Sequence, residues 1–230
     1  MTLNSKFDAC YLGEMAFAKA ATIQRNIAQA VAEDNHRGIF LFLEHPPVIT
    51  LGKNASESHI LLSPEVLDSH GITIEHSERG GGVTFHGPGQ LIFYPILRVR
   101  GAYQVREYVE LLQNIVLNTL TEFGIKAVTK VNNPGVWVEN RKISSIGIRI
   151  HNGVASNGLC LNVFGDLSGF RYIIACNDPQ TLHTTLRNEA RTLADWDTIL
   201  GIFIKQVETV FGTQLSWQNA NHYKNLRVLT

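Results

Sequence analysis

The sequence predicts an α/β (α+β) fold in which helices flank a mixed, largely antiparallel sheet. Three segments carry apolar residues at helical spacing. The second half of the chain also contains runs in which apolar and polar residues alternate between Asn or Gly turns, a pattern typical of antiparallel hairpins. The helical segments are 14–34, 104–123 and 192–211, and the alternating runs are 135–138, 142–150 and 154–163. Because helices and strands do not alternate regularly, a Rossmann-type parallel sheet is disfavoured.

Length, charge and cysteine content narrow the class of protein further. No internal repeat and no Ser/Gly/Pro-rich linker divides the 230 residues, so we expect a single domain spanning 1–230, with helix 192–211 packing on it. Twenty Lys and Arg balance twenty Asp and Glu, so the overall charge predicts no nucleic-acid and no membrane partner. Three cysteines without C-x-x-C spacing, and no apolar run near the ~20 residues of a membrane span, predict a reduced, cytoplasmic protein.

The first half of the chain adds short elements. Pro46-Pro47 excludes a helix between two apolar runs, which are therefore expected to be buried strands. Ser63 and Pro64 begin a short helix that Gly71 ends. Strands are expected at 39–43, 48–51, 72–75 and 91–99 and around Cys10.

A glycine-rich block at residues 79–90 is the first candidate for function. Its sequence is RGGGVTFHGPGQ, in which five glycines and a proline surround Arg79, Thr84 and His86. Glycine at this density costs conformational entropy on folding, but it allows backbone amides to approach a ligand closely. An ordinary glycine-rich hairpin is the simpler alternative. Because long irregular loops in compact domains are usually functional, we favour a ligand-lining role.

Lys142 is the second candidate. If residues 142–150 form a regular strand, Lys142, Ser144 and Ile146 share one face, and Ile143 and Ser145 share the other. One face of the sheet would then carry a lysine beside a small residue.

Cys176 is the third candidate, because it ends an apolar segment just before Asn177-Asp178-Pro179. A thiol in such a place can be both desolvated and reachable. With an ordinary pKa near ~8.5, it needs a cationic or basic neighbour to ionise at neutral pH, and a desolvated lysine can also carry the proton. The residues alone favour simpler roles, with Cys176 as a small buried apolar side chain and Lys142 as a solvated one. Cys160 is expected inside a strand, at most as a pocket wall.

Among the nine histidines, His45 and His86 stand out. Each adjoins a backbone fixed by Pro or Gly, which would hold the imidazole in one place. The sequence has no local cluster of His, Cys and carboxylates with ligand spacing, so no metal site is expected.

Several of these motifs, taken in order, resemble the lipoyl(octanoyl) transferases. The resemblance runs across roughly residues 8–210, and the glycine-His-Gly-Pro-Gly-Gln block is its most specific part. It implies a biotin/lipoate-protein ligase-like fold and no cofactor. The segments that carry it are Glu44–Gly52, Arg79–Leu91 with Tyr94-Pro95, Lys142–Gly147, Gly158–Val163 and Cys176.

The resemblance also implies a reaction and its residues. An octanoyl group would pass from octanoyl-acyl carrier protein to the ε-amine of a lysine on a lipoyl domain. The acceptors would be the lipoyl domains of 2-oxoacid dehydrogenases and the glycine cleavage H protein. Cys176 would carry the acyl thioester, and Lys142 would activate Cys176. Substrate-binding positions would be Arg79, Gly80, Gly81, Gly82, Val83, Thr84, Phe85, His86, Ser145, Ile146, Gly147, Gly158, Leu159 and Cys160.

Three positions depart from the family's pattern. Asn157 stands where members generally carry His, Cys160 where Ala is usual, and Asn177 where Gly usually follows the nucleophile. Asn forms hydrogen bonds but holds no proton, which puts the pH dependence in question. The bulk of Cys160 puts the acyl-chain preference in question. Asn177 tolerates positive φ better than most residues, so the turn can survive.

Two other functions stay open. An ATP-dependent lipoate- or biotin-protein ligase would share the fold but would need no thiol, and a catalytically silent module would only bind acyl or lipoyl domains. Because the net charge is zero, an acidic carrier protein would have to dock on a local basic patch, for which Arg98, Arg100 and Arg106 are candidates.

Overall fold

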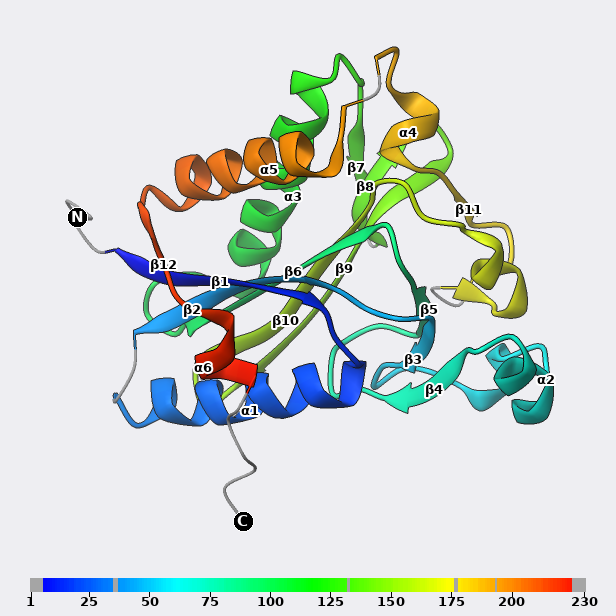
Figure 1. Ribbon diagram of the computed structural model, residues 1–230, viewed down its shortest axis with the longest axis horizontal. Helices are drawn as coiled ribbons and strands as arrows, with labels where there is room; N and C mark the ends of the chain where they lie inside the picture. The colour runs from blue at the N-terminus through cyan, green and yellow to red at the C-terminus, as the bar shows by residue number, and fades with distance from the viewer. Residues whose placement is uncertain (1–5, 35–36, 132, 176–177, 193, 225–230) are drawn as a thin grey trace.

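The computed structural model describes residues 6–34, 37–131, 133–175, 178–192 and 194–224. A large twisted sheet runs through the middle of the molecule, with helices on both sides (Figure 1). Among the described residues it has nine strands, in the order β12-β1-β2-β6-β10-β9-β8-β7, with β11 beside β9. Its strands are β1 (Phe7–Glu14), β2 (Gly38–Glu44), β6 (Gln90–Arg98), β7 (Val128–Lys130), β8 (Asn133–Val138), β9 (Arg141–His151), β10 (Val154–Asn162), β11 (Leu182–His183) and β12 (Leu215–Trp217).

Most neighbours in this sheet are antiparallel. The consecutive pairs β2–β6, β6–β10, β10–β9, β9–β8 and β8–β7 are all antiparallel, whereas β1 pairs in parallel with β2 and β12, and β11 with β9. The hairpins β8–β9 and β9–β10 arise where the sequence alternates with period two. The predicted fold class is therefore confirmed.

Each face of the large sheet has its own core. Helices α3 (Val105–Glu122) and α5 (Trp196–Phe211) cover one face, where Phe40, Phe93 and Phe203 pack together. Helices α1 (Phe17–Ala32) and α6 (Ala220–Lys224) lie on the other side in Figure 1. Burial of these apolar side chains is the main stabilising contribution to the fold.

A second, three-stranded sheet lies beyond the N-terminal end of α1 (Figure 1). It has the order β4-β3-β5, and its apolar core includes the short helix α2. Its position leaves a space between β5 and the strands β9 and β10. Its elements are β3 (Val48–Leu51), β4 (Thr73–His76), β5 (Val83–His86) and α2 (Pro64–Ser69), with the single-turn helix η1 (Glu57–His59) between β3 and α2. The single-turn helix η2 (Ser168–Tyr172) contacts β5 from later in the chain, and the one-turn helix α4 (Leu186–Glu189) packs in the core of the large sheet.

Several predicted boundaries were wrong. The helix predicted at 14–34 is shorter, since β1 continues to Glu14. The helix predicted from Thr192 begins at Trp196, because the Asp195 carboxylate accepts a hydrogen bond from the backbone N–H of Thr198 and caps the helix there. The glycine-rich block, predicted as an irregular loop between strands, contains the strand β5.

The predicted faces of β9 were also wrong. Val136 of β8 pairs with Ser144, but the next residue, Trp137, pairs with Lys142. Ile143 is therefore the extra residue of a β-bulge, which shifts the alternation by one position. As a result, Lys142 and Ser145 line the same cavity, although simple alternation places them on opposite faces.

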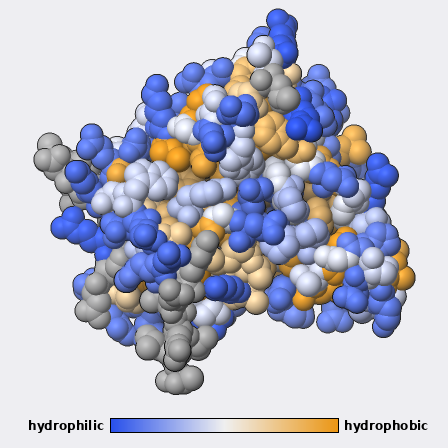
Figure 2. All heavy atoms as spheres, viewed as in Figure 1, coloured by the Kyte–Doolittle hydropathy of each residue, from blue (hydrophilic) through white to orange (hydrophobic). Residues whose placement is uncertain are grey.

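Polar and charged side chains cover much of the face in Figure 2, with apolar side chains visible in separate patches between them. Within the described ranges, no helix has the length and apolar character needed to cross a bilayer.

Candidate active site

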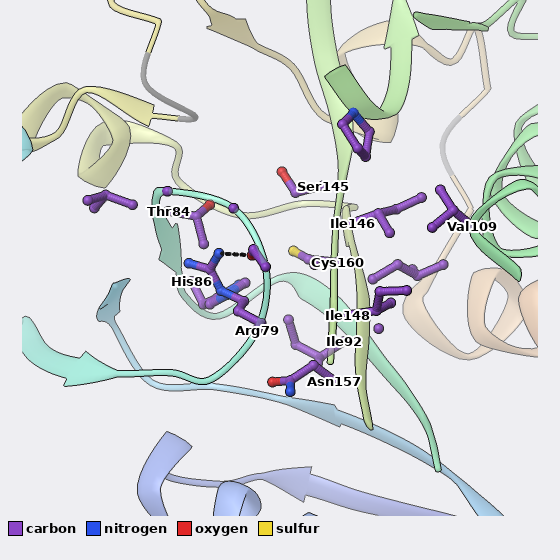
Figure 3. A pocket seen from close by; sticks show the side chains of 18 of the residues that line it. Arg79, Thr84, His86, Ile92, Val109, Ser145, Ile146, Ile148, Asn157 and Cys160 are labelled. Atoms are coloured by element: carbon purple, nitrogen blue, oxygen red, sulfur yellow. Dashed lines mark hydrogen bonds between the residues drawn. The ribbon is translucent and has the colours of Figure 1, made fainter. Parts of the chain in front are cut away.

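A cavity of about 420 Å³ lies between the glycine-rich block and the paired strands β9 and β10 (Figure 3). Thirteen of the fourteen predicted binding residues line it, together with Lys142. Asn157, singled out only as a departure from the family, lines it too. Lining residues that sequence reasoning missed are Phe17, Asn54, Ile92, Tyr94, Val109, Asn133, Pro134 and Ile148.

Phe85 is the predicted binding residue that does not line the cavity. It lies between Thr84 and His86 on β5, and both of those line the cavity. Because neighbouring residues on a strand point to opposite faces, Phe85 points the other way. It packs edge-on against Phe170 in the core of the small sheet. Its position indicates a structural contribution, and contact of Phe85 with substrate stays a prediction.

Arg79 holds the glycine-rich loop closed over β3. Its Nη2 donates to both the backbone carbonyl and the hydroxyl oxygen of Thr50 at 2.8 Å, and its Nη1 donates to the carbonyl of Gly80 at 3.1 Å. The side chain also crosses Gly147 of β9, where a Cβ atom would lie 3.0 Å from Cδ of Arg79. Arg79 therefore builds the wall of the cavity, with most of its guanidinium donors used inside the protein.

Lys142 is almost completely buried, with 2% of its surface exposed. Its Nζ donates to Oδ1 of Asn133 at 3.0 Å and lies 5.2 Å from the centre of the Trp137 ring. Asn133 begins β8 just before Pro134. A polar residue beside this proline is the feature of the sequence that could have indicated Asn133 as a site residue. A buried lysine held by a neutral amide and an aromatic ring contradicts the simpler prediction of a solvated side chain.

His183 lies beside Lys142 on the neighbouring strand. The two residues are partners in the parallel pairing of β11 with β9. The His183 ring stacks on Phe170, with ring centres 3.6 Å apart. Burial and, to a smaller extent, the Lys142 ammonium together lower the pKa of His183 to about 3. A neutral imidazole therefore lies next to Lys142, outside the residues that line the cavity.

The cysteines divide into two groups. Cys10 and Cys160 are buried thiols, and Cys10 lies in β1 as predicted. Cys160 lines the cavity opposite Ser145 of β9, and burial raises its pKa, so it stays a thiol. Cys176 and Asn177, for which we predicted a nucleophile and its turn, lie outside the described residues. Ala175, just before them, is buried in the core of the small sheet.

His45 is fixed in the interior, as its proline neighbours suggested. Its Nδ1 lies 2.6 Å from the carbonyl oxygen of Met15, and its Nε2 lies 2.9 Å from the hydroxyl of Tyr94. Because a carbonyl only accepts, Nδ1 carries the proton, and Nε2 accepts from the Tyr94 hydroxyl. Burial lowers the pKa of His45 to about 4.

His86 lies close to His45, with ring centres 5.9 Å apart. Its Nδ1 is 3.2 Å from Oε1 of Gln90. Burial lowers the pKa of His86 well below its ordinary value, and the neighbouring His45 and Arg79 act in the same direction. His86 is therefore neutral at physiological pH.

Asn157 occupies an interruption in the sheet. The pairing of β10 with β6 stops between Leu159–Phe93 and Ala155–Leu97, and Pro95, which has no N–H, lies in the gap. Asn157 adopts φ +58°, a conformation that Asn tolerates, and its N–H donates to Oε1 of Gln24 on α1 at 2.8 Å. The proline thus explains why β10 bends here and turns Asn157 towards the cavity.

The arrangement of the two sheets, the glycine-rich loop and the buried lysine is that of an enzyme of the lipoate- and biotin-ligase fold. The family model described as lipoyl protein ligase A/B catalytic domain matches residues 17–209. The chain belongs to this family, as the sequence predicted.

Two curated relatives of similar length are octanoyltransferases. An octanoyltransferase from Desulfotalea psychrophila is 39% identical over 211 residues, which cover 90% of this chain and 91% of the relative. An octanoyltransferase from Chloroflexus aurantiacus is 37% identical over 208 residues, covering 89% and 93%.

Solved structures support the fold. A lipoate protein ligase from Thermoplasma acidophilum with bound lipoic acid has a TM-score of 0.77 at 12% identity and covers 96% of this chain and 93% of its own. Lipoate-protein ligase A bound with ATP has a TM-score of 0.79 at 13% identity, with coverage of 98% and 97%. At such identities the likeness concerns the fold alone.

Proposed function

We propose that this protein moves an octanoyl group from the thioester of an acyl carrier protein to Cys176, and then to the ε-amine of a lysine on a lipoyl domain. Octanoyl transfer is the activity named for the curated relatives, so the prediction of an acyltransferase in protein lipoylation is confirmed at that level. The covalent route and the roles of individual residues are our proposal.

The burial of Lys142 at the cavity is the observation that carries this proposal. Burying the Lys142 ammonium group, which donates to Asn133, costs free energy because the charge loses its hydration. A lysine with a purely structural role would not require this cost. A cation beside a thiol lowers the pKa of the thiol and favours the thiolate, by ~1.4 kcal/mol per pKa unit. We assign this function to Lys142 towards Cys176.

The first half of the reaction exchanges one thioester for another. The Cys176 thiolate attacks the carbonyl carbon of the octanoyl thioester and forms a new C–S bond. The bond to the carrier's sulfur breaks, and the carrier leaves as a thiol after taking a proton from the Lys142 ammonium, which becomes a neutral amine. Thioester exchange is near neutral in free energy, so this step requires positioning and an ionised thiol more than a driving force.

The second half forms an amide. The lysine amine of the lipoyl domain attacks the octanoyl-Cys176 carbonyl, the C–S bond breaks, and Lys142 accepts the proton that the amine loses. Because a lysine can release and take up a proton, and an arginine cannot, Lys142 is suited to both halves. Formation of the amide drives the reaction to completion.

The cavity wall suits a saturated chain. Ile92, Ile146, Ile148, Val109 and Leu159 contribute apolar surface, while Gly147 and Gly158, which pair across β9 and β10, keep the floor free of side chains. A mostly apolar lining with few polar groups is typical of sites for small apolar ligands.

The partners follow from the reaction: an acyl carrier protein as donor and lipoyl domains as acceptors. Two of the three arginines predicted to form a docking patch are already engaged. Arg98 pairs with Asp34 at 2.6 Å and donates to the last carbonyls of α1, and Arg106 pairs with Glu110. Because the side chain of Arg106 is exposed, Arg100 and Arg106 remain candidates for the docking patch. The cytoplasmic location stays a prediction.

Intact-protein mass spectrometry after mixing the enzyme with octanoyl carrier protein tests the route. We expect an octanoyl adduct that hydroxylamine removes, and none on Cys176→Ser. The variant Cys10→Ser is the matched control, because Cys10 is buried in β1, and it should keep the adduct. Peptide mapping must place the acyl group on the peptide with Cys176 rather than on Cys160.

The outcomes separate the alternatives. If no adduct forms on folded enzyme and transfer requires ATP and the free acid, the protein is an ATP-dependent ligase. If neither donor supports transfer but lipoyl or acyl carrier domains bind, the protein is a silent binding module. Either result overturns the Cys176 mechanism.

A further inference from the structure

We propose that Gln90 and Asn162 are positioning residues that fix the tautomer of His86, so that Nε2 of His86 presents a lone pair to the cavity. The structural part of this proposal stands on hydrogen bonds alone. Its kinetic consequence rests on the proposed octanoyl transfer.

A backbone carbonyl fixes the orientation of the Asn162 side chain. Nδ2 of Asn162 lies 3.0 Å from the carbonyl oxygen of Thr184. A carbonyl oxygen only accepts hydrogen bonds, so the amide nitrogen of Asn162 must face it. The side-chain oxygen Oδ1 of Asn162 must then face the other way, towards Gln90.

The orientation of Gln90 is fixed from three sides. Its Nε2 donates to Oδ1 of Asn162 at 3.0 Å and lies 3.5 Å from the carbonyl of Phe85, an obligatory acceptor. Its Oε1 accepts from the backbone N–H of Gly87 at 3.3 Å, an obligatory donor. A flipped amide would place two acceptors together and two donors together, so only one orientation is allowed.

The tautomer of His86 follows. Oε1 of Gln90 can only accept, so Nδ1 of His86, 3.2 Å away, carries the proton. In a neutral imidazole the other nitrogen, Nε2, is then an acceptor. His86 lines the cavity, and no hydrogen bond to Nε2 from another described residue is found.

The hydrogen bonds from Thr184 through Asn162 and Gln90 to His86 form a relay that is buried and extends to β9, the strand of Lys142. Gln90, Asn162 and Thr184 are 1%, 3% and 2% exposed. In such a site an unmade hydrogen bond is costly, so the relay keeps its polarity. The backbone N–H of Thr184 donates to the carbonyl of Lys142 at 3.0 Å, so one chain of bonds joins the glycine-rich block to β9.

The lone pair on Nε2 of His86 can accept a hydrogen bond from a substrate in the proposed reaction. The octanoyl chain has no hydrogen-bond donor, but the incoming lysine amine does. An acceptor at Nε2 can hold an N–H of that amine as it approaches the acyl group, whereas the opposite tautomer would turn a donor towards it. We therefore expect the relay to matter for the second half of the reaction more than for the first.

Nuclear magnetic resonance of the protein labelled with 15N-histidine tests the tautomer directly. The His86 signals are identified by their loss in His86→Gln. We expect a protonated Nδ1 and an unprotonated Nε2 in the unaltered protein. In Gln90→Met, which keeps the size but removes the hydrogen bonds, we expect population of the Nε2–H form. Gln206→Met is the control, because Gln206 is also buried but donates to Glu122 on α3.

A second variant tests the polarity of the relay. In Gln90→Glu, the oxygen that replaces Nε2 faces Oδ1 of Asn162 and the carbonyl of Phe85, which only accept, so the buried carboxyl group should keep its proton and donate there. Its other oxygen still accepts from Nδ1–H, so we expect the tautomer of His86 to stay as it is in the unaltered protein. Kinetically, Gln90→Met should slow transfer to the lipoyl domain at least tenfold while acyl-enzyme formation changes less than twofold.

These experiments distinguish failure of the tautomer assignment from failure of the proposed function. An Nε2–H tautomer in the unaltered protein, or an unchanged tautomer in folded Gln90→Met, overturns the proposal, and the unaltered protein alone suffices if the variant does not fold. The predicted tautomer in a protein that forms no acyl-enzyme would keep the structural assignment and reject the proposed function instead.

Discussion

Gly135 and Lys142 lie on adjacent strands so close together that a Cβ atom on Gly135 would be 2.5 Å from Cε of Lys142 and 3.3 Å from Nζ. Gly135 also has φ +143°, a conformation that residues with a side chain rarely adopt. The glycine therefore leaves the space in which the buried lysine extends towards Asn133, and the position of the ammonium depends on a residue with no side chain.

Gly135→Ala should displace Lys142. We expect the rate of octanoyl transfer to fall about 100-fold, since a displacement of about 1 Å at a reacting group can cost that much. The added methyl group should also destabilise the fold by about 1–3 kcal/mol through overpacking. Steady-state kinetics and urea unfolding measure the two effects.

Gly201→Ala is the control: nothing lies within 4 Å of a Cβ atom at that position in α5, and alanine should stabilise the helix by about 0.5–1 kcal/mol. Full activity in Gly135→Ala would refute the role of this space.

Lys142→Met separates a functional lysine from a structural one. The variant keeps the length of the side chain and removes the ammonium group. Because general acid–base groups typically contribute about 10²–10⁴-fold, we expect a loss of at least 100-fold in transfer. The melting temperature should not fall, since a buried charge is replaced by an apolar group. Single-turnover transfer assays and calorimetry provide the data, with the exposed Lys126→Met as control. A large fall in stability with little loss of rate would assign Lys142 a structural role.

The sequence predicted the parts of the fold that depend on local periodicity. Apolar residues recur at helical spacing in α1, α3 and α5, and they alternate with polar residues in β8, β9 and β10. Both patterns reflect burial of one face, and these elements lie close to where the pattern predicts them. Glycine density indicated the cavity wall correctly, because close approach of backbone to a ligand requires it.

Features that depend on distant partners could not be predicted in this way. The bulge at Ile143 depends on how β8 meets β9, and it moved Lys142 to the face of Ser145. The bond between Gln90 and Asn162 joins residues 72 positions apart. Neither residue type nor spacing in the chain indicates that these two amides face each other in the interior.

Arg79→Lys tests whether the guanidinium group of Arg79 anchors the glycine-rich block to β3. A lysine cannot reproduce the paired bonds to the carbonyl and hydroxyl of Thr50 together with the bond to Gly80. Because hydrogen bonds to charged groups contribute about 1.5–3 kcal/mol each, we expect destabilisation of at least that size for one lost bond. Urea unfolding gives the value. Arg106→Lys, at an exposed ion pair with Glu110, should change stability by no more than about 0.5 kcal/mol. Equal effects at the two sites would contradict the anchoring role.

His45 should make the protein sensitive to acid. Its pKa is about 4 in the folded protein and near 6.5 when unfolded, so the unfolded chain binds the extra proton between these values. The stabilising contribution is therefore complete above the unfolded pKa and is lost as the pH falls from about 6.5 to 4. By linkage, the His45 contribution should fall by about 2 kcal/mol between pH 7 and pH 5.

Urea unfolding at pH 7 and pH 5 measures this contribution by comparing the protein with His45→Gln. The variant should be less stable at pH 7, because the bonds to Met15 and Tyr94 are disturbed, but its stability should depend less steeply on pH. His70→Gln is the control for the chemical change itself, since His70 is exposed at the end of α2. The same slope in His45→Gln as in the unaltered protein would show that His45 titrates equally in both states and would refute its role in acid sensitivity.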